Sequence, residues 1–321
     1  MRLGRQLGTA DVPDGRVDVL SRMFEPHKTI RARVEYAEAE RHEKKGGGTE
    51  VPEALRAADA LVAVAGLFSI EDPSQLESAA RAELADLMAE TILSDQVVLE
   101  SRHEKVRRAD RVGKKPEDPR EMPLLEKCVA ALAQEEPLRA LDFSPEDERL
   151  LRGYQLLSRK PLLVVLNVAE DRLAEGHALE AGLHAGPHSA ALTLSAKVES
   201  EIVALSPEER PAFLEMIGLK EAARDRLLRA SYDLLGLHSF FTVGKDEVRA
   251  WTVRKGAAAV EAAGVIHTDL ARGFIRAEVI SYAQMVEAKT LAHAREKGWL
   301  RLEGKEYVVQ DGDILNIRFS V

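Results

Sequence analysis

The sequence predicts an α/β protein of about two domains, in which a parallel sheet carries a helical hairpin and a mixed α+β module follows. The chain has 321 residues, which is more than one ordinary hydrophobic core accommodates. Continuous apolar runs of strand length alternate with helical patterns, as in proteins with a parallel sheet. The last stretch instead shows alternating strands around short helices, which is typical of a small α+β unit.

Composition and charge narrow the class of protein. Hydrophobic residues make up 45% of the chain and charged residues 31%, as in a soluble globular protein, and the net charge is −9. A negative net charge does not attract nucleic acid, so any RNA contact must come from a local basic face. No DNA partner is expected. No apolar run approaches the ~20 residues of a membrane span, and the first residues lack the apolar core of a signal peptide. We expect a cytoplasmic protein with no membrane partner.

The N-terminal part, up to about residue 66, predicts short strands and connectors. Residues 31–37 alternate weakly, as a strand with one wet face does. Residues 44–49 contain three consecutive glycines and predict a flexible loop. The apolar run at 60–65 has the length and composition of a buried parallel strand.

A helical hairpin is predicted within residues 73–158. Residues 76–112 form an amphipathic pattern free of glycine and proline, and a break at 113–119 separates it from a second helix at 124–134. The single cysteine, Cys128, lies in that second helix, where we interpret it as a small buried hydrophobe. Ser144 begins a further helix as its N-cap, with proline next and acids in the first turn.

Two more buried strands follow, at 160–167 and 190–195. A helix is expected to open at Ser206 by the same capping logic, and another spans 219–235 and ends at Gly236.

The tail has its own pattern. Residues 247–253 and 275–280 alternate as antiparallel strands, and 257–263 form a short helix closed by Gly264. Asp311-Gly312-Asp313 predicts a turn before a last strand at 314–319. Trp251 and Phe274 are interpreted as core or half-buried sheet residues, and His267 as a residue that caps a helix or forms a local hydrogen bond.

Seven segments together resemble the YchF (Obg-like ATPase) family of P-loop proteins, in family order and at plausible spacing, over nearly the whole chain. The resemblance is strong from about Leu138 onward and weak from Tyr36 to Ser74. The segments are Val12–Asp18, Leu138–Asp142, Asn167–Asp171, Glu247–Thr252, Ile266–Asp269, Arg272–Ala277 and Val309–Asp313.

This resemblance implies a domain organisation. Residues 1–237 would form an incomplete P-loop G-type domain with the helical insertion at about 73–158. Residues 238–321 would form a TGS-like domain of the ubiquitin-like β-grasp type. The family further implies ATP or GTP with Mg²⁺ as ligands, and the ribosome or another ribonucleoprotein as partner.

The phosphate-binding part departs from the family pattern. No GxxxxGK[ST] motif occurs in the 321 residues, and Gly46-Gly47-Gly48 lacks a following lysine. Where the family carries Asp-x-x-Gly, this chain has Glu38-Ala39-Glu40-Arg41. Glu38 is at most a candidate Mg²⁺ ligand, and Arg41 puts a side chain where the family has glycine. No catalytic residue is assigned.

The base-recognition part matches the family pattern more closely than the phosphate-binding part does. Asn167 and Glu170 follow a buried strand, at the carboxyl end where α/β proteins bind ligands. An amide can donate to a purine edge and a nearby carboxylate can accept from it. The resemblance assigns base binding to these two residues and to Ser195, Ala196 and Lys197 after the next strand. Spacing alone favours a strand-end asparagine and a solvated acid, and only the resemblance favours a base site.

Two other clusters are candidate sites. The long helix carries a basic group that could contact RNA phosphates, although a solvated helix face with pairs such as Glu104–Arg108 is the favoured interpretation. Asp171, Glu175 and His177 lie close in sequence but lack convincing metal-ligand spacing. The basic group consists of Arg102, Lys105, Arg107, Arg108 and Arg111.

Three functions follow as hypotheses. The first is a ribosome-associated binding factor of the YchF type with impaired or absent hydrolysis. The alternative is an active ATPase or GTPase whose P-loop segment lies outside this sequence. The third is a regulatory remnant that pairs with another protein.

Overall fold

The computed structural model describes residues 7–39, 42–43, 49–50, 52–113, 118–183 and 186–320. Its described residues divide into two compact units. The first unit holds Leu7 and residues 37–230, and the second holds residues 8–36 and 231–320. The predicted boundary at residue 237 is therefore wrong in one respect, because residues 8–36 belong to the C-terminal unit. Their apolar side chains pack against that unit's sheet.

The first unit is built on a parallel three-stranded sheet in the order β6-β7-β8, which confirms the predicted strand type. The central strand is buried along its first five residues, because it has a neighbouring strand on each side and is covered on both faces. The strands are β6 (Leu61–Gly66), β7 (Leu162–Asn167) and β8 (Ser189–Leu194).

Short helices connect and cover these strands. One prediction was wrong here: Ser206 does not begin a helix. Its backbone N–H and hydroxyl both donate to the Glu209 carboxylate in a turn, and α8 begins at Arg210. The predicted helix at 219–235 is shorter and begins at Ala223. The elements are α2 (Glu53–Ala57), η3 (Glu170–Arg172), α6 (Leu173–Leu179), η4 (Glu180–Gly182), α7 (Ala196–Ala204), α8 (Arg210–Met216) and α9 (Ala223–Leu234).

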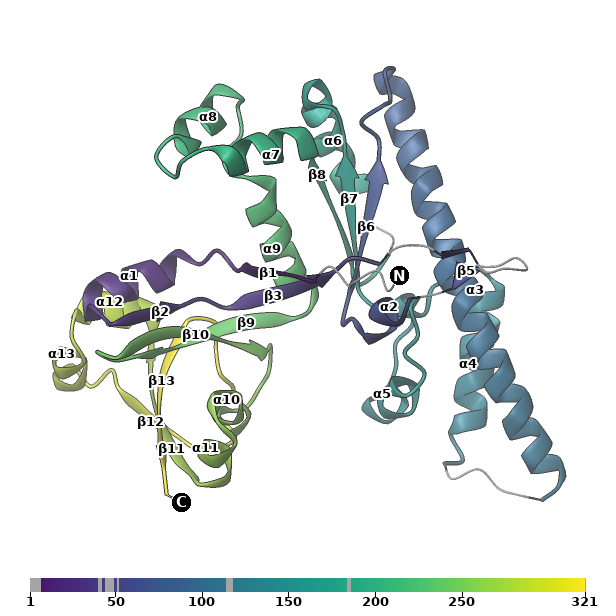
Figure 1. Ribbon diagram of the computed structural model, residues 1–321. Helices are drawn as coiled ribbons and strands as arrows, with labels where there is room; N and C mark the ends of the chain where they lie inside the picture. The colour runs from purple at the N-terminus through teal and green to yellow at the C-terminus, as the bar shows by residue number, and fades with distance from the viewer. Residues whose placement is uncertain are drawn as a thin grey trace, which may run out of the picture. The chain divides into compact units, whose positions relative to one another are not determined.

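The helical hairpin is confirmed, and Figure 1 shows its two helices side by side. Its core includes Cys128, which is fully buried, and burial raises the pKa of that thiol to about 11. Ser144 caps the following helix in a reciprocal capping box with Asp147, as predicted. The elements are η1 (Pro73–Gln75), α3 (Leu76–Arg111), α4 (Glu121–Ala133), η2 (Leu138–Ala140) and α5 (Pro145–Arg152).

The second unit is built on a six-stranded sheet in the order β12-β11-β13-β9-β10-β2. The hairpin of β9 and β10 is antiparallel, whereas β9 lies parallel to the last strand, β13. β9 and β13, the first and last strands of residues 231–320, are therefore neighbours in the middle of the sheet. The strands are β2 (Lys28–Ile30), β9 (Leu237–Val243), β10 (Glu247–Arg254), β11 (Phe274–Ser281), β12 (Arg301–Glu303) and β13 (Asp313–Phe319).

Helices contribute to an apolar core on each face of this sheet. Phe274 belongs to the core with α10, and the half-buried Trp251 packs against that core. His267 accepts from the Asp269 N–H as the N-cap of α11. Gly264 does not close its helix, which continues to Ile266. The helices on this side are α10 (Ala259–Ile266) and α11 (Thr268–Arg272).

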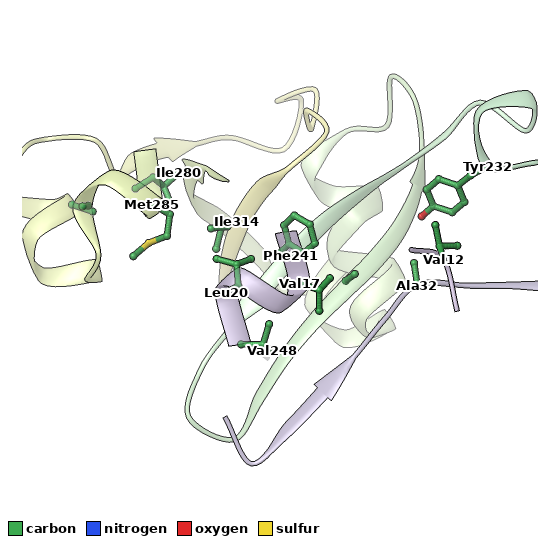
Figure 2. Packing of buried hydrophobic residues seen from close by; sticks show 13 residues of the cluster. Val12, Val17, Leu20, Ala32, Tyr232, Phe241, Val248, Ile280, Met285 and Ile314 are labelled. Carbon is green, nitrogen blue, oxygen red and sulfur yellow. The ribbon is translucent and has the colours of Figure 1, made fainter. Parts of the chain in front are cut away.

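The other core includes α1 (Gly15–Phe24), α12 (Tyr282–Ala288) and α13 (Leu291–Glu296). Figure 2 shows Val17 and Leu20 of α1 beside Phe241 of β9, Val248 of β10 and Ile314 of β13. The N-terminal segment was expected to hold only strands and connectors, so α1 is an addition. The sequence does carry its start signal, since the Asp14 side chain accepts from the Arg16 N–H as N-cap.

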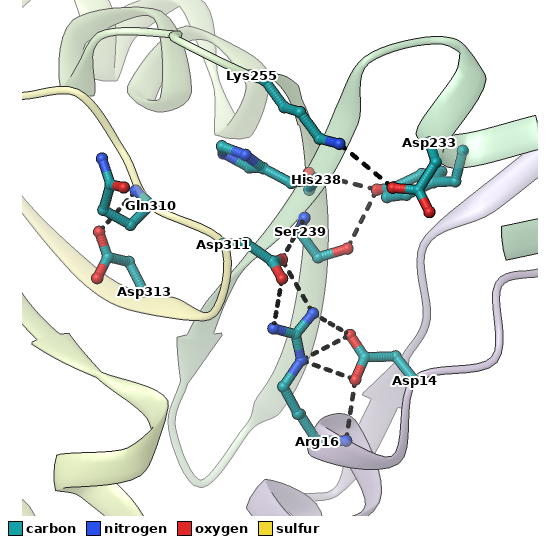
Figure 3. Close-up of polar contacts among 10 residues, drawn as sticks. Asp14, Arg16, Asp233, His238, Ser239, Lys255, Gln310, Asp311 and Asp313 are labelled. Carbon is teal, nitrogen blue, oxygen red and sulfur yellow. Dashed lines mark hydrogen bonds and ion pairs between the residues drawn. The ribbon is translucent and has the colours of Figure 1, made fainter. Parts of the chain in front are cut away.

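A polar contact adds to this apolar packing. The Arg16 guanidinium donates to both oxygens of Asp14 and to both oxygens of Asp311, at 2.9 to 3.2 Å (Figure 3). Two motifs that lie at opposite ends of the sequence, around Pro13 and around Gly312, therefore meet in one unit.

Two small two-stranded sheets complete the description. One pairs β1 (Leu7–Asp11) with β3 (Arg33–Ala37), and the other pairs β4 (His42–Glu43) with β5 (Thr49–Glu50). The predicted glycine loop at 44–48 and the position of Arg41 lie outside the described residues.

Candidate functional site

A cavity of about 960 Å³ opens at the carboxyl ends of the parallel strands in the first unit. Each strand contributes through the residues at its end: Phe68 follows β6, Asn167 ends β7, and Ser195 to Lys197 follow β8. The structure brings together all five residues to which the sequence assigned base binding: Asn167, Glu170, Ser195, Ala196 and Lys197. Its volume lies within the range of small-molecule sites.

Strand register places these residues at one level. Asn167 is paired with Gly66 on one side and with Leu194 on the other. Beyond the strands, the Leu67 N–H donates to the Asn167 carbonyl and the Val168 N–H to the Leu194 carbonyl, both at 2.9 Å. The three strand ends therefore share one edge, as expected for a ligand site of a parallel sheet.

Asn167 presents a hydrogen-bond donor to the cavity. Its Oδ1 accepts from the Ala196 N–H at 2.9 Å, and this bond fixes which end of the amide is oxygen. The Nδ2 group has no hydrogen bond to another described residue. A ligand at this wall therefore meets a donor, which suits an acceptor such as a ring nitrogen.

Glu170 and Lys197 form the charged part of the wall. The Lys197 ammonium lies 3.4 Å from the Glu170 carboxylate, and both side chains are substantially exposed. Such an exposed pair contributes little to stability. Ser195 is buried, and its hydroxyl accepts no N–H of α7.

Apolar side chains complete the cavity, and no sequence pattern predicted them. Phe68 is 62% exposed and Met216 is 73% exposed, although both are large and apolar. With Ile217 and Leu173 they offer flat apolar contacts of the kind that planar rings use. Large exposed apolar groups at a cavity mark a binding surface rather than a packing fault.

A carboxylate beneath the cavity ties its supporting elements together. Glu180 accepts from the Thr193 N–H of β8 at 2.7 Å, from His177 at 2.7 Å, and from Arg226 of α9 at 2.8 and 2.9 Å. Burial alone would raise the pKa of Glu180, but hydrogen bonds from Arg226, His177 and Thr193 outweigh burial and lower it. Glu180 therefore stays charged and fixes β8 just before Ser195.

The basic group on α3 is only partly free. Arg102 pairs with Glu121 at 2.6 Å, and Arg108 pairs with Glu104 at 2.8 Å, which is the intrahelical alternative raised from the sequence. The pKa of Glu104 is lowered first by the Arg108 hydrogen bond and further by the nearby charges of Arg107 and Arg111. Lys105, Arg107 and Arg111 are exposed. Their role in RNA contact stays a prediction.

The described part of the chain gives no support for a resident metal. No three His, Cys, Asp or Glu side chains gather there as ligands, and Glu38 is an exposed residue just after β3. Asp171 and Glu175 instead both pair with Arg172, at 3.4 and 3.7 Å. The residues assigned to base binding from the sequence offer an amide and a carboxylate, as a purine ring requires, whereas the described residues offer no comparable set for Mg²⁺. No helix among the described residues is long and apolar enough to cross a membrane.

The fold and the cavity define a protein with a nucleotide-binding type of parallel sheet and a β-grasp unit in one chain. Comparison with known proteins agrees. The family model YchF-GTPase_C, described as a protein of unknown function (DUF933), matches residues 237–320. The ribosome-binding ATPase YchF of Bacillus subtilis is 37% identical over 329 residues, covering 98% of this chain and 89% of the relative. The chain belongs to the YchF family.

Other relatives fit the same assignment. The ribosome-binding ATPase YchF of Escherichia coli O157:H7 is 34% identical over 325 residues, with the same two coverages of 98% and 89%. The solved structure of the Schizosaccharomyces pombe YchF GTPase superposes with a TM-score of 0.83 at 24% identity, covering 99% of this chain and 88% of that one. That likeness supports the fold.

Proposed function

We propose that this chain is a ribosome-associated binding factor that holds a purine ring in the cavity at the ends of β6, β7 and β8. The observation that carries the proposal is the convergence of the five sequence-assigned residues on one cavity. Under this proposal, the 321 residues themselves do not hydrolyse nucleotide, since they contain no GxxxxGK[ST] motif.

The chemistry of the wall favours a planar heteroaromatic ring. Phe68 and Met216 supply apolar surface, the Asn167 Nδ2 group supplies a donor, and the Glu170 carboxylate supplies an acceptor. A purine has an apolar face, ring nitrogens that accept, and either an exocyclic or a ring N–H that donates. A saturated sugar or an aliphatic chain would use only part of this set.

The proposed ribosomal partner comes from the relatives, which are named ribosome-binding ATPases. The exposed cations Lys105, Arg107 and Arg111 on α3 support it, because exposed cations on one helix can contact phosphates. The name of these relatives also favours the alternative, an active hydrolase. Release of phosphate from ATP by this chain, above the rate of an Asn167→Ala variant, would favour that alternative.

Replacing Asn167 with alanine is expected to weaken adenosine binding about tenfold, because one hydrogen bond to a ring nitrogen is lost. Isothermal titration calorimetry of the purified chain measures this effect. Asn316→Ala is the matched control, since Asn316 donates to Glu278 in the other unit and should leave affinity unchanged. Equal affinities for the wild type and Asn167→Ala would remove Asn167 from the site.

Charge reversal on α3 is expected to weaken ribosome co-sedimentation. Arg107→Glu and Arg108→Glu together should lower the bound fraction and flatten its dependence on salt, because fewer phosphate contacts release fewer counterions. The single variant Arg108→Glu is compared with Arg81→Glu as its control. Arg81 lies on the same helix and also pairs with a carboxylate four residues away. If Arg81→Glu and Arg108→Glu behave alike, the patch has no specific role.

A further inference from the structure

The charges around the cavity do not suit an anionic ligand. Three charged side chains line it: Glu170, Asp171 and Lys197. Two carboxylates and one ammonium give a net charge of −1. The one ammonium already lies 3.4 Å from the Glu170 carboxylate, so its field is largely neutralised.

The neighbouring cation is also committed to carboxylates. Arg172 lies next to the cavity wall in sequence, but its guanidinium pairs with Asp171 at 3.4 Å and with Glu175 at 3.7 Å. It also donates to the Glu71 carbonyl at 3.2 Å. Arg172 therefore balances two acids and does not make this region positive.

Among the described residues, the amino end of α7 is a further source of positive potential at the wall. Its contribution is reduced in two ways. The Ala196 N–H already donates to the Asn167 Oδ1, and Glu199 places a carboxylate in the first turn. The other lining side chains, such as Phe68, Val168, Leu173 and Met216, are neutral.

From this charge balance we infer that the cavity binds an uncharged purine nucleoside or free base and discriminates against its phosphate esters. The inference rests on the proposed purine site and names its ligand class. The phosphates of a nucleotide would add negative charge beside a wall whose net charge is already negative. Each added phosphate should therefore weaken binding, whereas a phosphate-gripping nucleotide site shows the opposite trend.

The test is a calorimetric series on the full chain with adenosine, AMP, ADP and ATP, each with and without Mg²⁺, and the matching guanosine series. Affinity should fall along at least one series, to about tenfold weaker for the triphosphate than for the nucleoside, with no gain from Mg²⁺. Affinity that rises with phosphate number overturns this inference and leaves the purine site standing. Absence of binding by every member overturns both.

A charge variant separates electrostatics from shape. Asp171→Asn removes one lining carboxylate and should narrow the ratio of nucleoside affinity to triphosphate affinity about threefold at low salt. Glu175→Gln makes the same charge change on a residue that does not line the cavity, and should narrow the ratio less. An equal ratio in the wild type and Asp171→Asn would contradict an electrostatic origin.

Discussion

Replacing Leu20 with alanine is expected to lower the free energy of unfolding of the second unit by about 3 kcal/mol. Leu20 is fully buried in α1, in the core that also holds Phe241 of β9, Val248 of β10 and Ile314 of β13. Removing its side-chain carbons leaves a cavity that the surrounding sheet cannot fill. Urea unfolding followed by tryptophan fluorescence measures the effect, because Trp251 and Trp299 both lie in this unit.

Leu302→Ala is the control, since Leu302 is 51% exposed on β12 and its truncation should cost less than about 0.5 kcal/mol. The comparison tests the domain boundary itself. If Leu20→Ala cost no more than Leu302→Ala, residues 8–36 would not belong to the core of the C-terminal unit.

Asp95→Ala should have a comparable effect, about 3 kcal/mol or more, on the first unit. The Asp95 carboxylate is fully buried and accepts from the Leu157 N–H at 2.8 Å, and from the Ser158 N–H and hydroxyl at 2.7 and 2.6 Å. Burial raises the pKa of Asp95, and these hydrogen bonds only partly offset the increase. Alanine leaves three buried donors unpaired.

The buried Arg139 adds to this cost. Burial lowers the pKa of Arg139 to about 10, while the nearby charge of Asp95 raises it, so losing the carboxylate leaves that guanidinium less stable. Hydrogen exchange of the β7 amides measures the effect, since both tryptophans lie in the other unit. Asp86→Ala, an exposed site on the same helix, is the control. Equal protection in Asp86→Ala and Asp95→Ala would show that Asp95 does not stabilise the unit.

Local patterns predicted most of the first unit and three strands of the second unit's sheet, β10, β11 and β13. The apolar run at 162–166 has no polar residue, so it can only be a strand covered on both faces. The capping residues Ser144 and His267 were found because their side chains act within three residues of themselves. The helix start predicted at Ser206 was wrong for a related reason. Ser206 and Glu209 have the residue types and spacing of a capping box, but their hydrogen bonds form a turn.

The placement of α1 could not be predicted, because it depends on contacts distant in sequence. Val17 and Leu20 identify an apolar face, but only the folded chain shows that the face meets β9, β10 and β13. The contact between Arg16 and Asp311 joins residues 295 positions apart. A single boundary in the sequence cannot describe a unit that consists of residues 8–36 and 231–320.

The candidate site shows the same division. The sequence was enough to assign Asn167 and Ser195 to one site, since parallel strands end at a common edge. Phe68 and Met216 could not, because single apolar residues beside a strand end or on a short helix leave no periodic pattern. Their exposure is visible only in three dimensions.

The most direct test of a purine site at the strand ends is a crystal structure of the chain with adenosine. The account predicts the ring between the strand ends, against Phe68, with a ring nitrogen within hydrogen-bonding distance of the Asn167 Nδ2 group. Adenosine bound elsewhere, or no ordered ligand in the cavity at saturating adenosine, would contradict it.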